Sequence, residues 1–148
     1  MTLEKLKDYR ERGFTIVELL IVIVVIAILA TLVITAYNGV QQRARDSKRV
    51  SDARAIQTAV EAYQSDNGSY PTLAQLTATT NTVKLDSTLS AAIQATPAPD
   101  ATTNRDKYQY QRCVTGGAGV GAKIMYWQES GTAGVQTKNL GDVSGTCS

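Results

Sequence analysis

A single acidic residue, Glu18, lies inside a long apolar segment, where a charged side chain is costly. Residues 14–36 form a run of 23 residues in which Glu18 is the only charged one. An apolar helix of roughly 20 residues spans a bilayer, and a carboxylate within it costs about 2.5–3.5 kcal/mol on insertion scales. Such an acid is a functional-site hypothesis by default. Because the run contains no Lys, Arg or His, we expect the partner of Glu18 to come from elsewhere.

Other residues that carry out chemistry are sparse. The chain has no His, and it offers no paired acids or Ser–Lys arrangement that would supply a general base or an activated nucleophile. Asp86, Asp100, Asp106 and Asp142 lack the Asp-x-Asn-x-Asp spacing of a calcium loop. We therefore expect no enzymatic activity, no cofactor and no metal site.

A glycine-rich stretch at residues 116–121 raises the alternative of a phosphate-binding loop. Such a loop follows a strand and opens a helix. This stretch instead lies between two strand-like segments, so we predict a hairpin loop.

The two cysteines, Cys113 and Cys147, enclose 33 residues and follow the apolar run. Two cysteines in an oxidising compartment pair by default, and unrelated thiols or half of a zinc site are the alternatives. On the chain-entropy model, closing such a loop contributes about 3–4 kcal/mol to stability. We predict a disulfide and, with it, an extracytoplasmic location for the body of the protein.

A short basic leader precedes the apolar run and contains Lys5, Lys7, Arg10 and Arg12. A secretory signal peptide is one alternative, but its apolar region has about 7–15 residues and a small-residue cleavage site follows it. An ordinary single-pass anchor is the other alternative. Four basic residues precede the run and five follow it by residue 54, so the positive-inside rule does not decide the orientation. The cysteines favour an amino end in the cytoplasm and a body outside.

Helical character continues beyond the apolar run. Apolar residues recur there at spacings of three and four and form one stripe: Ala53, Ile56, Val60 and Tyr63. We predict one helix from about Phe14 to Ser65, apolar in its first half and amphipathic in its second. It ends where Asp66-Asn67-Gly68 tolerates left-handed geometry. At 1.5 Å rise per residue, these 52 residues make a rod of about 78 Å.

Short elements follow Pro71. We predict a helix over Leu73–Leu76 with Thr72 as its N-cap, then a long connecting loop over residues 77–106 with one helical turn near 89–93. Three strands follow, at about residues 107–114, 122–128 and 135–139. A long helix, a loop and an antiparallel meander together predict an α+β fold in which a small antiparallel β-sheet covers the helix stripe.

The charge of the chain argues against nucleic-acid binding. Removing the 4 basic and 3 acidic residues of the leader from totals of 15 and 13 leaves 11 basic and 10 acidic residues. A nucleic-acid binder shows a clustered basic face. Five basic residues do cluster between Arg43 and Arg54, beside Asp46 and Asp52. We interpret them as a solvated or headgroup-facing surface of the helix.

The order Gly13-Phe14-Thr15-x-x-Glu18, followed directly by an apolar helix, resembles the type IV pilin and pseudopilin superfamily. The resemblance extends more loosely to the turn at residues 66–71. It implies that a prepilin peptidase cuts between Gly13 and Phe14 and then methylates the new amine of Phe14. It also implies that Glu18 pairs with the Phe14 amine of an adjacent subunit and sets the axial register.

The resemblance implies four parts and contains one departure. The parts are a leader at residues 1–13 that prepilin peptidase removes, a transmembrane and filament-core helix at 14–36, its amphipathic continuation at 37–65, and a globular α+β region at 66–148. Many relatives have a glycine where Ala27 stands and a proline where Thr35 stands, and these accompany local unwinding in assembled pili. Here Gly39 is the only obvious weak point nearby.

The resulting hypothesis is a structural subunit of a type IV pilus-like surface filament. A pseudopilin of a type II secretion system is one alternative, and a minor or competence pilin that binds DNA or a surface is another. The turn at residues 66–71 resembles pseudopilins, whereas a carboxyl-terminal disulfide loop resembles pilins. The expected partners are other subunits, the prepilin peptidase, a membrane assembly platform and, before assembly, membrane lipid. We expect a single-pass precursor in the cytoplasmic membrane and a mature form in an extracellular pilus.

Overall fold

The structure is a computed structural model that describes residues 13–78 and 85–148. Most of the predicted leader, residues 1–12, lies outside the described residues. The chain divides into two units, Met1–Asn38 and Gly39–Ser148. The amphipathic part of the long helix therefore belongs to the same unit as the sheet.

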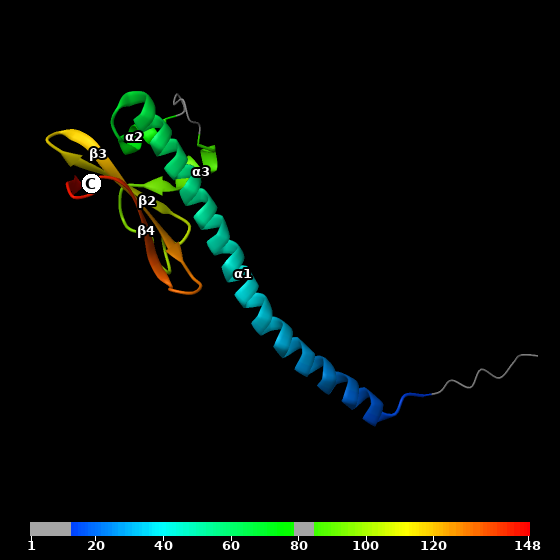
Figure 1. Ribbon diagram of the computed structural model, residues 1–148. Helices are drawn as coiled ribbons and strands as arrows, with labels where there is room; N and C mark the ends of the chain where they lie inside the picture. The colour runs from blue at the N-terminus through cyan, green and yellow to red at the C-terminus, as the bar shows by residue number, and fades with distance from the viewer. Residues whose placement is uncertain (1–12, 79–84) are drawn as a thin grey trace, which may run out of the picture. The chain divides into compact units, whose positions relative to one another are not determined.

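The long helix α1 spans Ile16–Asn67 and contains 52 residues (Figure 1). It begins two residues later than predicted because Thr15 acts as its N-cap, accepting a backbone N–H through its hydroxyl oxygen. It also ends two residues later than predicted. Gly68, the next residue, has a φ of 70°, a left-handed conformation in which glycine commonly ends a helix.

Two short helices follow α1. α2 spans Leu73–Thr77, and Thr72 caps it through a capping box with Gln75. This confirms the predicted helix and its N-cap. α3 spans Ser87–Ala92 and is capped by Asp86, where the sequence predicts only a single helical turn within a loop.

Five strands form one sheet. They are β1 (Ile93–Gln94), β2 (Tyr108–Thr115), β3 (Ala118–Gln128), β4 (Gly134–Gly141) and β5 (Thr146–Cys147). The order is β1-β2-β3-β4, and β5 pairs with β2. All pairs are antiparallel except β1 and β2, which pair in parallel over two residues. β1 and β5 have only two residues each, too few to produce an alternating pattern in the sequence.

The glycine-rich stretch forms the hairpin between β2 and β3, as predicted. Gly116 and Gly117 have φ values of 60° and 87°, the two positive values that a tight hairpin turn requires. Thr115 and Ala118 pair across the turn. β3 therefore begins at Ala118, four residues earlier than the sequence predicts.

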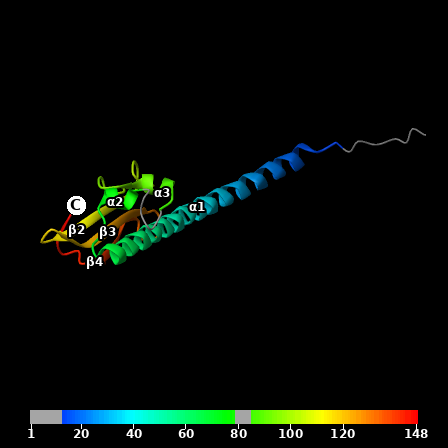
Figure 2. The same cartoon turned by 90° about the horizontal axis from the view of Figure 1, so that it is seen from above.

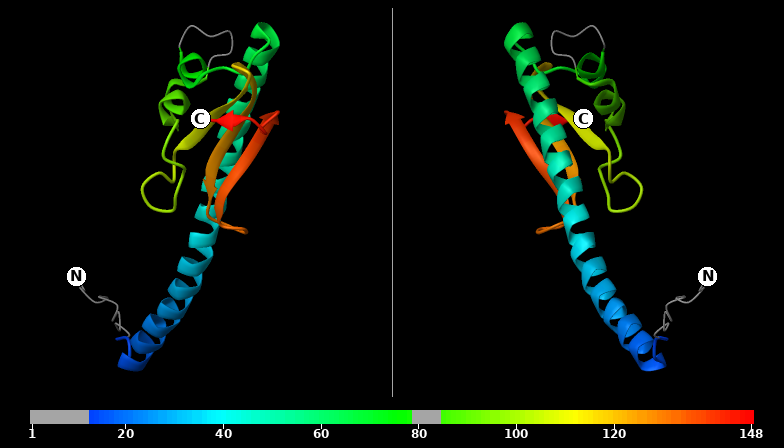
Figure 3. Two further views of the ribbon diagram at one scale, coloured as in Figure 1. Left: turned by 90° about the vertical axis from the view of Figure 1, so that its left-hand side faces the viewer. Right: turned by 90° about the vertical axis from the view of Figure 1, so that its right-hand side faces the viewer.

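The sheet packs against the second half of α1 and encloses one apolar core (Figures 1 and 3). The largest contributions come from α1 (Ala53, Ile56, Ala59 and Val60) and from the sheet (Tyr108, Tyr110, Ala122, Ile124, Tyr126 and Leu140). None of these residues is more than 7 % exposed. Figure 2 shows β2, β3 and β4 alongside the green, carboxyl-terminal part of α1. The predicted α+β fold, with a long helix packed on a small sheet, is confirmed.

The turn that follows α1 is tied to the β2–β3 hairpin. Tyr70 N donates to Gly119 O at 3.1 Å, and Tyr70 O accepts a bond from Arg112 Nε at 2.9 Å. The next carbonyl, Pro71 O, accepts a bond from the hydroxyl of Tyr110 at 2.7 Å. Because Tyr110 is also a core residue, these bonds fix the end of α1 against the sheet.

Candidate functional site

The predicted cleavage junction is exposed and lies outside the helix. Gly13, Phe14 and Thr15 all precede α1, and Phe14 is 87 % exposed. The Gly13–Phe14 peptide bond is therefore accessible and is not part of the hydrogen-bonded helix.

Glu18 closes a capping box at the start of α1. Glu18 Oε2 accepts the backbone N–H and the hydroxyl of Thr15, each at 2.8 Å. In return, Thr15 Oγ1 accepts the Glu18 N–H at 3.2 Å. The carboxylate thus satisfies an N–H group near the helix start. The Thr-x-x-Glu spacing is the signal for this box in the sequence, and reasoning from charge alone misses it.

The apolar part of α1 exposes its side chains on all sides. From Ile16 to Ile34 the large apolar side chains are 47–86 % exposed. By length and composition, α1 is one helix that is apolar enough to cross a membrane. A helix that is apolar all round is stable only where lipid or other helices surround it.

The hydroxyl groups within this apolar part are satisfied by the helix itself. Thr31 Oγ1 donates to Ile28 O at 2.7 Å, and Thr35 Oγ1 donates to Leu32 O at 3.0 Å. Such bonds let a polar side chain enter an apolar medium without an external partner. α1 continues without a break through Ala27 and Thr35, the two positions at which many pilins carry helix breakers.

Only part of the basic cluster at residues 43–54 forms the solvated surface that the sequence predicts. Arg43 and Arg54 are exposed, but Arg49 is only 2 % exposed. The Arg49 guanidinium pairs with Asp46 at 3.0 Å and with Glu129 at 2.8 Å. Arg45 also pairs with Glu129, at 2.8 Å. Arg49 therefore lies inside the fold and Arg45 at its edge, although the sequence predicts that both face solvent or lipid headgroups.

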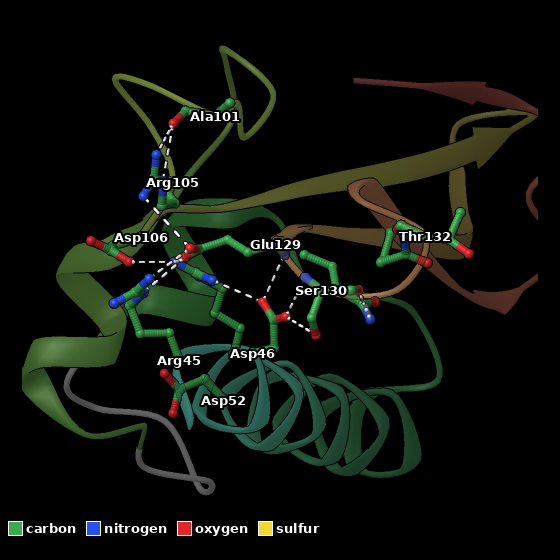
Figure 4. A network of polar contacts seen from close by, with 12 residues as sticks. Arg45, Asp46, Asp52, Ala101, Arg105, Asp106, Glu129, Ser130 and Thr132 are labelled. Atoms are coloured by element: carbon green, nitrogen blue, oxygen red, sulfur yellow. Dashed lines mark hydrogen bonds and ion pairs between the residues drawn. The ribbon is translucent and has the colours of Figure 1, made fainter. Parts of the chain in front are cut away.

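These contacts join α1 to the turn between β3 and β4 (Figure 4). Asp46 accepts bonds from the backbone N–H groups of Glu129 and Ser130, at 2.8 and 2.7 Å, and from the Ser130 hydroxyl at 2.6 Å. We refer to Arg45, Asp46, Arg49, Glu129 and Ser130 as the Arg49 cluster. Its three residues from α1 and its two residues from the turn are separated by about 80 residues along the chain, and no pattern in the sequence indicates that these two groups meet.

The Arg49 cluster keeps both of its carboxylates ionised. The hydrogen bond from Arg45 is the main cause that lowers the pKa of Glu129 from its usual 4.5 to about 2. Burial opposes ionisation of Asp46, but hydrogen bonds from Ser130 and Glu129 outweigh it, so the pKa of Asp46 also lies below its usual value. Acidic and basic groups therefore neutralise one another within this cluster.

The two cysteines form a disulfide that holds the carboxyl end to the sheet. Cys113 in β2 and Cys147 in β5 are directly paired positions. Beside them, Arg112 and Ser148 exchange both backbone hydrogen bonds, at 3.0 and 3.1 Å. The last residues of the chain are thus fixed by covalent and hydrogen bonds together.

The four aspartates weighed as calcium ligands serve separate local roles. Asp86 caps α3, Asp100 accepts backbone N–H groups of its own loop, and Asp142 accepts an N–H of its own turn. Asp106 pairs with Arg49 at 3.1 Å. Within residues 13–78 and 85–148, no group of three His, Cys, Asp or Glu could hold a metal ion.

Comparison with known proteins locates a motif at the junction. The family model described as the prokaryotic N-terminal methylation motif matches residues 8–34. This range includes Gly13, Phe14, Thr15 and Glu18, the residues that carry the resemblance to pilins and pseudopilins.

Several curated proteins are similar to part of the chain. It is 40% identical over 67 residues to the type II secretion system core protein G of Pectobacterium carotovorum subsp. carotovorum, a match covering 45% of this chain and 43% of that protein. It is 42% identical over 66 residues to the protein of the same name from Escherichia coli (strain K12), covering 45% and 46% of the two chains. The match thus spans less than half of each of these relatives. No solved structure matches the chain.

The methylation motif, the pseudopilin relatives and the α+β fold with its long amino-terminal helix agree with one another. Together they support the resemblance to the type IV pilin and pseudopilin superfamily: the chain carries the prokaryotic N-terminal methylation motif and is similar over part of its length to type II secretion system core protein G.

Proposed function

We propose that the chain is a structural subunit of a type IV pilus-like surface filament that polymerises through its apolar helix. The observation that carries the proposal is the exposed apolar surface of residues 14–36, in which Glu18 is the only charge. Such a surface needs an apolar environment. Membrane lipid supplies it to the precursor, and the helices of other subunits supply it in the filament.

Maturation creates a positively charged group that can pair with the carboxylate of Glu18. Prepilin peptidase removes residues 1–13 by cutting between Gly13 and Phe14, and the amine of Phe14 is then methylated. The accessible junction and the methylation motif at residues 8–34 support this step. The product has a positive charge at the head of an apolar helix.

On assembly, the carboxylate of Glu18 exchanges its neutral hydrogen-bond donors in Thr15 for a charged donor from another subunit. In the single chain its carboxylate accepts the N–H and hydroxyl of Thr15. In the filament, the Phe14 amine of an adjacent subunit is a charged donor, and a charge-assisted hydrogen bond is about twice as strong as a neutral one. Apolar helices slide past one another with little change in energy, whereas a buried ion pair has one good alignment. The pair therefore sets the axial register.

The remaining parts of the chain have assigned places in this proposal. Residues 37–65 continue the core helix, and residues 66–148 form the globular region outside the cytoplasmic membrane. The partners are other subunits, the prepilin peptidase and a membrane assembly platform. The mature form is located in an extracellular pilus.

A pseudopilin of a type II secretion system is the second candidate. The names of the relatives favour it, since both are type II secretion system core protein G. The disulfide that closes the carboxyl-terminal region favours the pilus, because this feature resembles pilins more than the major pseudopilins.

Electron microscopy of a deletion strain and its complemented control separates the two candidates. We expect the parent and complemented strains to carry long surface filaments that antibody against residues 85–148 decorates, and the deletion strain to lack them. Loss of protein secretion in the deletion strain, with unchanged surface filaments, would replace the pilus by the pseudopilus. Loss of DNA uptake with normal filaments would favour a minor pilin.

A further inference from the structure

The turn between β3 and β4 is attached to the molecule by polar contacts. Glu129 and Ser130 bond to Asp46, Arg49 and Arg45 of α1. No residue from 129 to 133 belongs to the apolar core or to the partly buried residues packed against it. This turn can therefore leave α1 without exposing the core.

The Arg49 cluster is not fully satisfied in its closed form. Arg49 Nε is buried and has no hydrogen-bond partner, an arrangement that costs free energy. Opening the turn would admit water to this atom and to both carboxylates. Because water replaces polar contacts but not apolar ones, opening here requires less free energy than unfolding of the core.

The opposite end of the same interface is held differently. The turn after α1 bonds to the sheet through the hydroxyl of Tyr110, a residue that is 1 % exposed and belongs to the core. Detaching that end would disturb the apolar core, whereas detaching the β3–β4 turn would not.

We propose that the Arg49 cluster is a latch that opens independently of the rest of the body. In the open state the β3–β4 turn leaves α1, and Asp46 and Arg49 become accessible on the helix. The apolar core and the turn after α1 stay folded. The latch is a property of the unit Gly39–Ser148 and does not depend on filament formation.

Amide hydrogen exchange of the full chain in detergent micelles tests the latch. The N–H groups of Glu129 and Ser130 report on it directly, because both donate to Asp46. In Arg49→Met, which removes the cation, we expect these two amides to exchange at least about tenfold faster. The amide of Tyr70, which bonds to Gly119 O, should exchange at the parental rate.

Two further variants complete the test. Arg54→Met removes the same charge from an exposed position of α1 and should leave all of these rates unchanged. Ser130→Ala removes a single hydroxyl bond to Asp46 and should accelerate the same two amides by about threefold in a body that remains folded. Parental rates at Glu129 and Ser130 in both cluster variants would overturn the proposal. So would an equal acceleration at Tyr70, since it would mean that the body opens as one unit.

Discussion

At the scale of single residues, the carboxylate of Glu18 has a local role in the structure and a second, intermolecular role that we propose. The capping box occupies it with the N–H and hydroxyl of Thr15, which are neutral donors that any single chain carries. A protonated amine at Phe14 of another subunit is a stronger donor. Removing the negative charge while keeping an acceptor oxygen therefore distinguishes the two roles.

Replacing Glu18 by Ala should block assembly without blocking insertion. The change removes a charge that is costly inside an apolar helix, so membrane fractionation should recover at least as much subunit as the parent gives. The Phe14 amine would be buried without a counter-ion in the filament, a loss of about 3–5 kcal/mol for a broken buried pair. We expect few or no filaments by electron microscopy, and an intermediate number for Glu18→Asp.

The variant Glu18→Gln provides the matched control. Its side-chain oxygen can still accept the Thr15 N–H, so the capping box survives in neutral form. Filament numbers close to those of the parent would show that the carboxylate acts as a cap and would contradict the ion-pair argument.

A bulky side chain at position 13 should prevent maturation. Glycine is the smallest residue, and a peptidase site fitted to it has no space for Leu. Intact-mass measurement of membrane protein from Gly13→Leu cells should show the uncut precursor, while parental filaments should show a chain that starts at methylated Phe14. Detection of residues 1–13 in parental filaments would refute the assigned cleavage site.

At the scale of single elements, two glycines of the α1 region should respond to Ala in opposite directions. Gly39 lies inside α1, and a Cβ at this position meets no atom within 4 Å. Gly39→Ala should therefore raise the free energy of unfolding by about 0.5–1 kcal/mol. Gly68 has a φ of +70°, so Gly68→Ala should lower it by about 1–2 kcal/mol.

Urea titrations followed by circular dichroism in micelles would measure both changes. The two variants introduce the same side chain, so any nonspecific effect of Ala is common to them. A destabilised Gly39→Ala variant would show that this position needs glycine for a reason other than helix propensity.

The contact between α1 and the β3–β4 turn should make stability depend on acid pH. Mainly because of its hydrogen bond from Arg45, the folded-state pKa of Glu129 is depressed from 4.5 to about 2. The stability from this group is therefore fully present above about pH 4.5 and is lost as the pH falls toward 2. The lowered pKa of Asp46 adds a loss of the same sign.

Denaturation midpoints measured at several pH values between about 6 and 2.5 would test this dependence. Glu129→Gln should lower stability at neutral pH and flatten the decline in acid, because its amide does not titrate. A variant whose midpoint falls with pH as steeply as that of the parent would assign the acid sensitivity to other groups.

At the scale of the whole molecule, the disulfide stabilises the carboxyl-terminal region through its connectivity. It links Cys113 to Cys147 across a sequence separation of 34. Replacing both cysteines by Ser should lower the free energy of unfolding by about 3–4 kcal/mol on the chain-entropy model. Denaturation of the parent with and without reductant should reproduce that loss, whereas labelling of two free thiols in unreduced protein would contradict the bond.

The sequence by itself determines the features that depend on neighbouring residues. The apolar run with Glu18, the long helix with its stop near Gly68 and the hairpin at Gly116–Gly117 all follow from local spacing and backbone preference. The capping box at Thr15 belongs to the same class, since Thr-x-x-Glu spans a single turn.

Tertiary structure alone decides which partners the buried charges meet and which short strands form. β1 and β5 have two residues each, and they are strands only because β2 provides an edge to which they pair. Arg49 is buried and Arg54 is exposed, and helical spacing separates them, because Arg49 continues the stripe of Ala53 and Ile56 and Arg54 does not. The spacing does not reveal the partner: Glu129, about 80 residues away in the chain, lies beside Arg49 in the fold. Local periodicity carries no information about a contact at that separation, so only the packing of the sheet on α1 determines it.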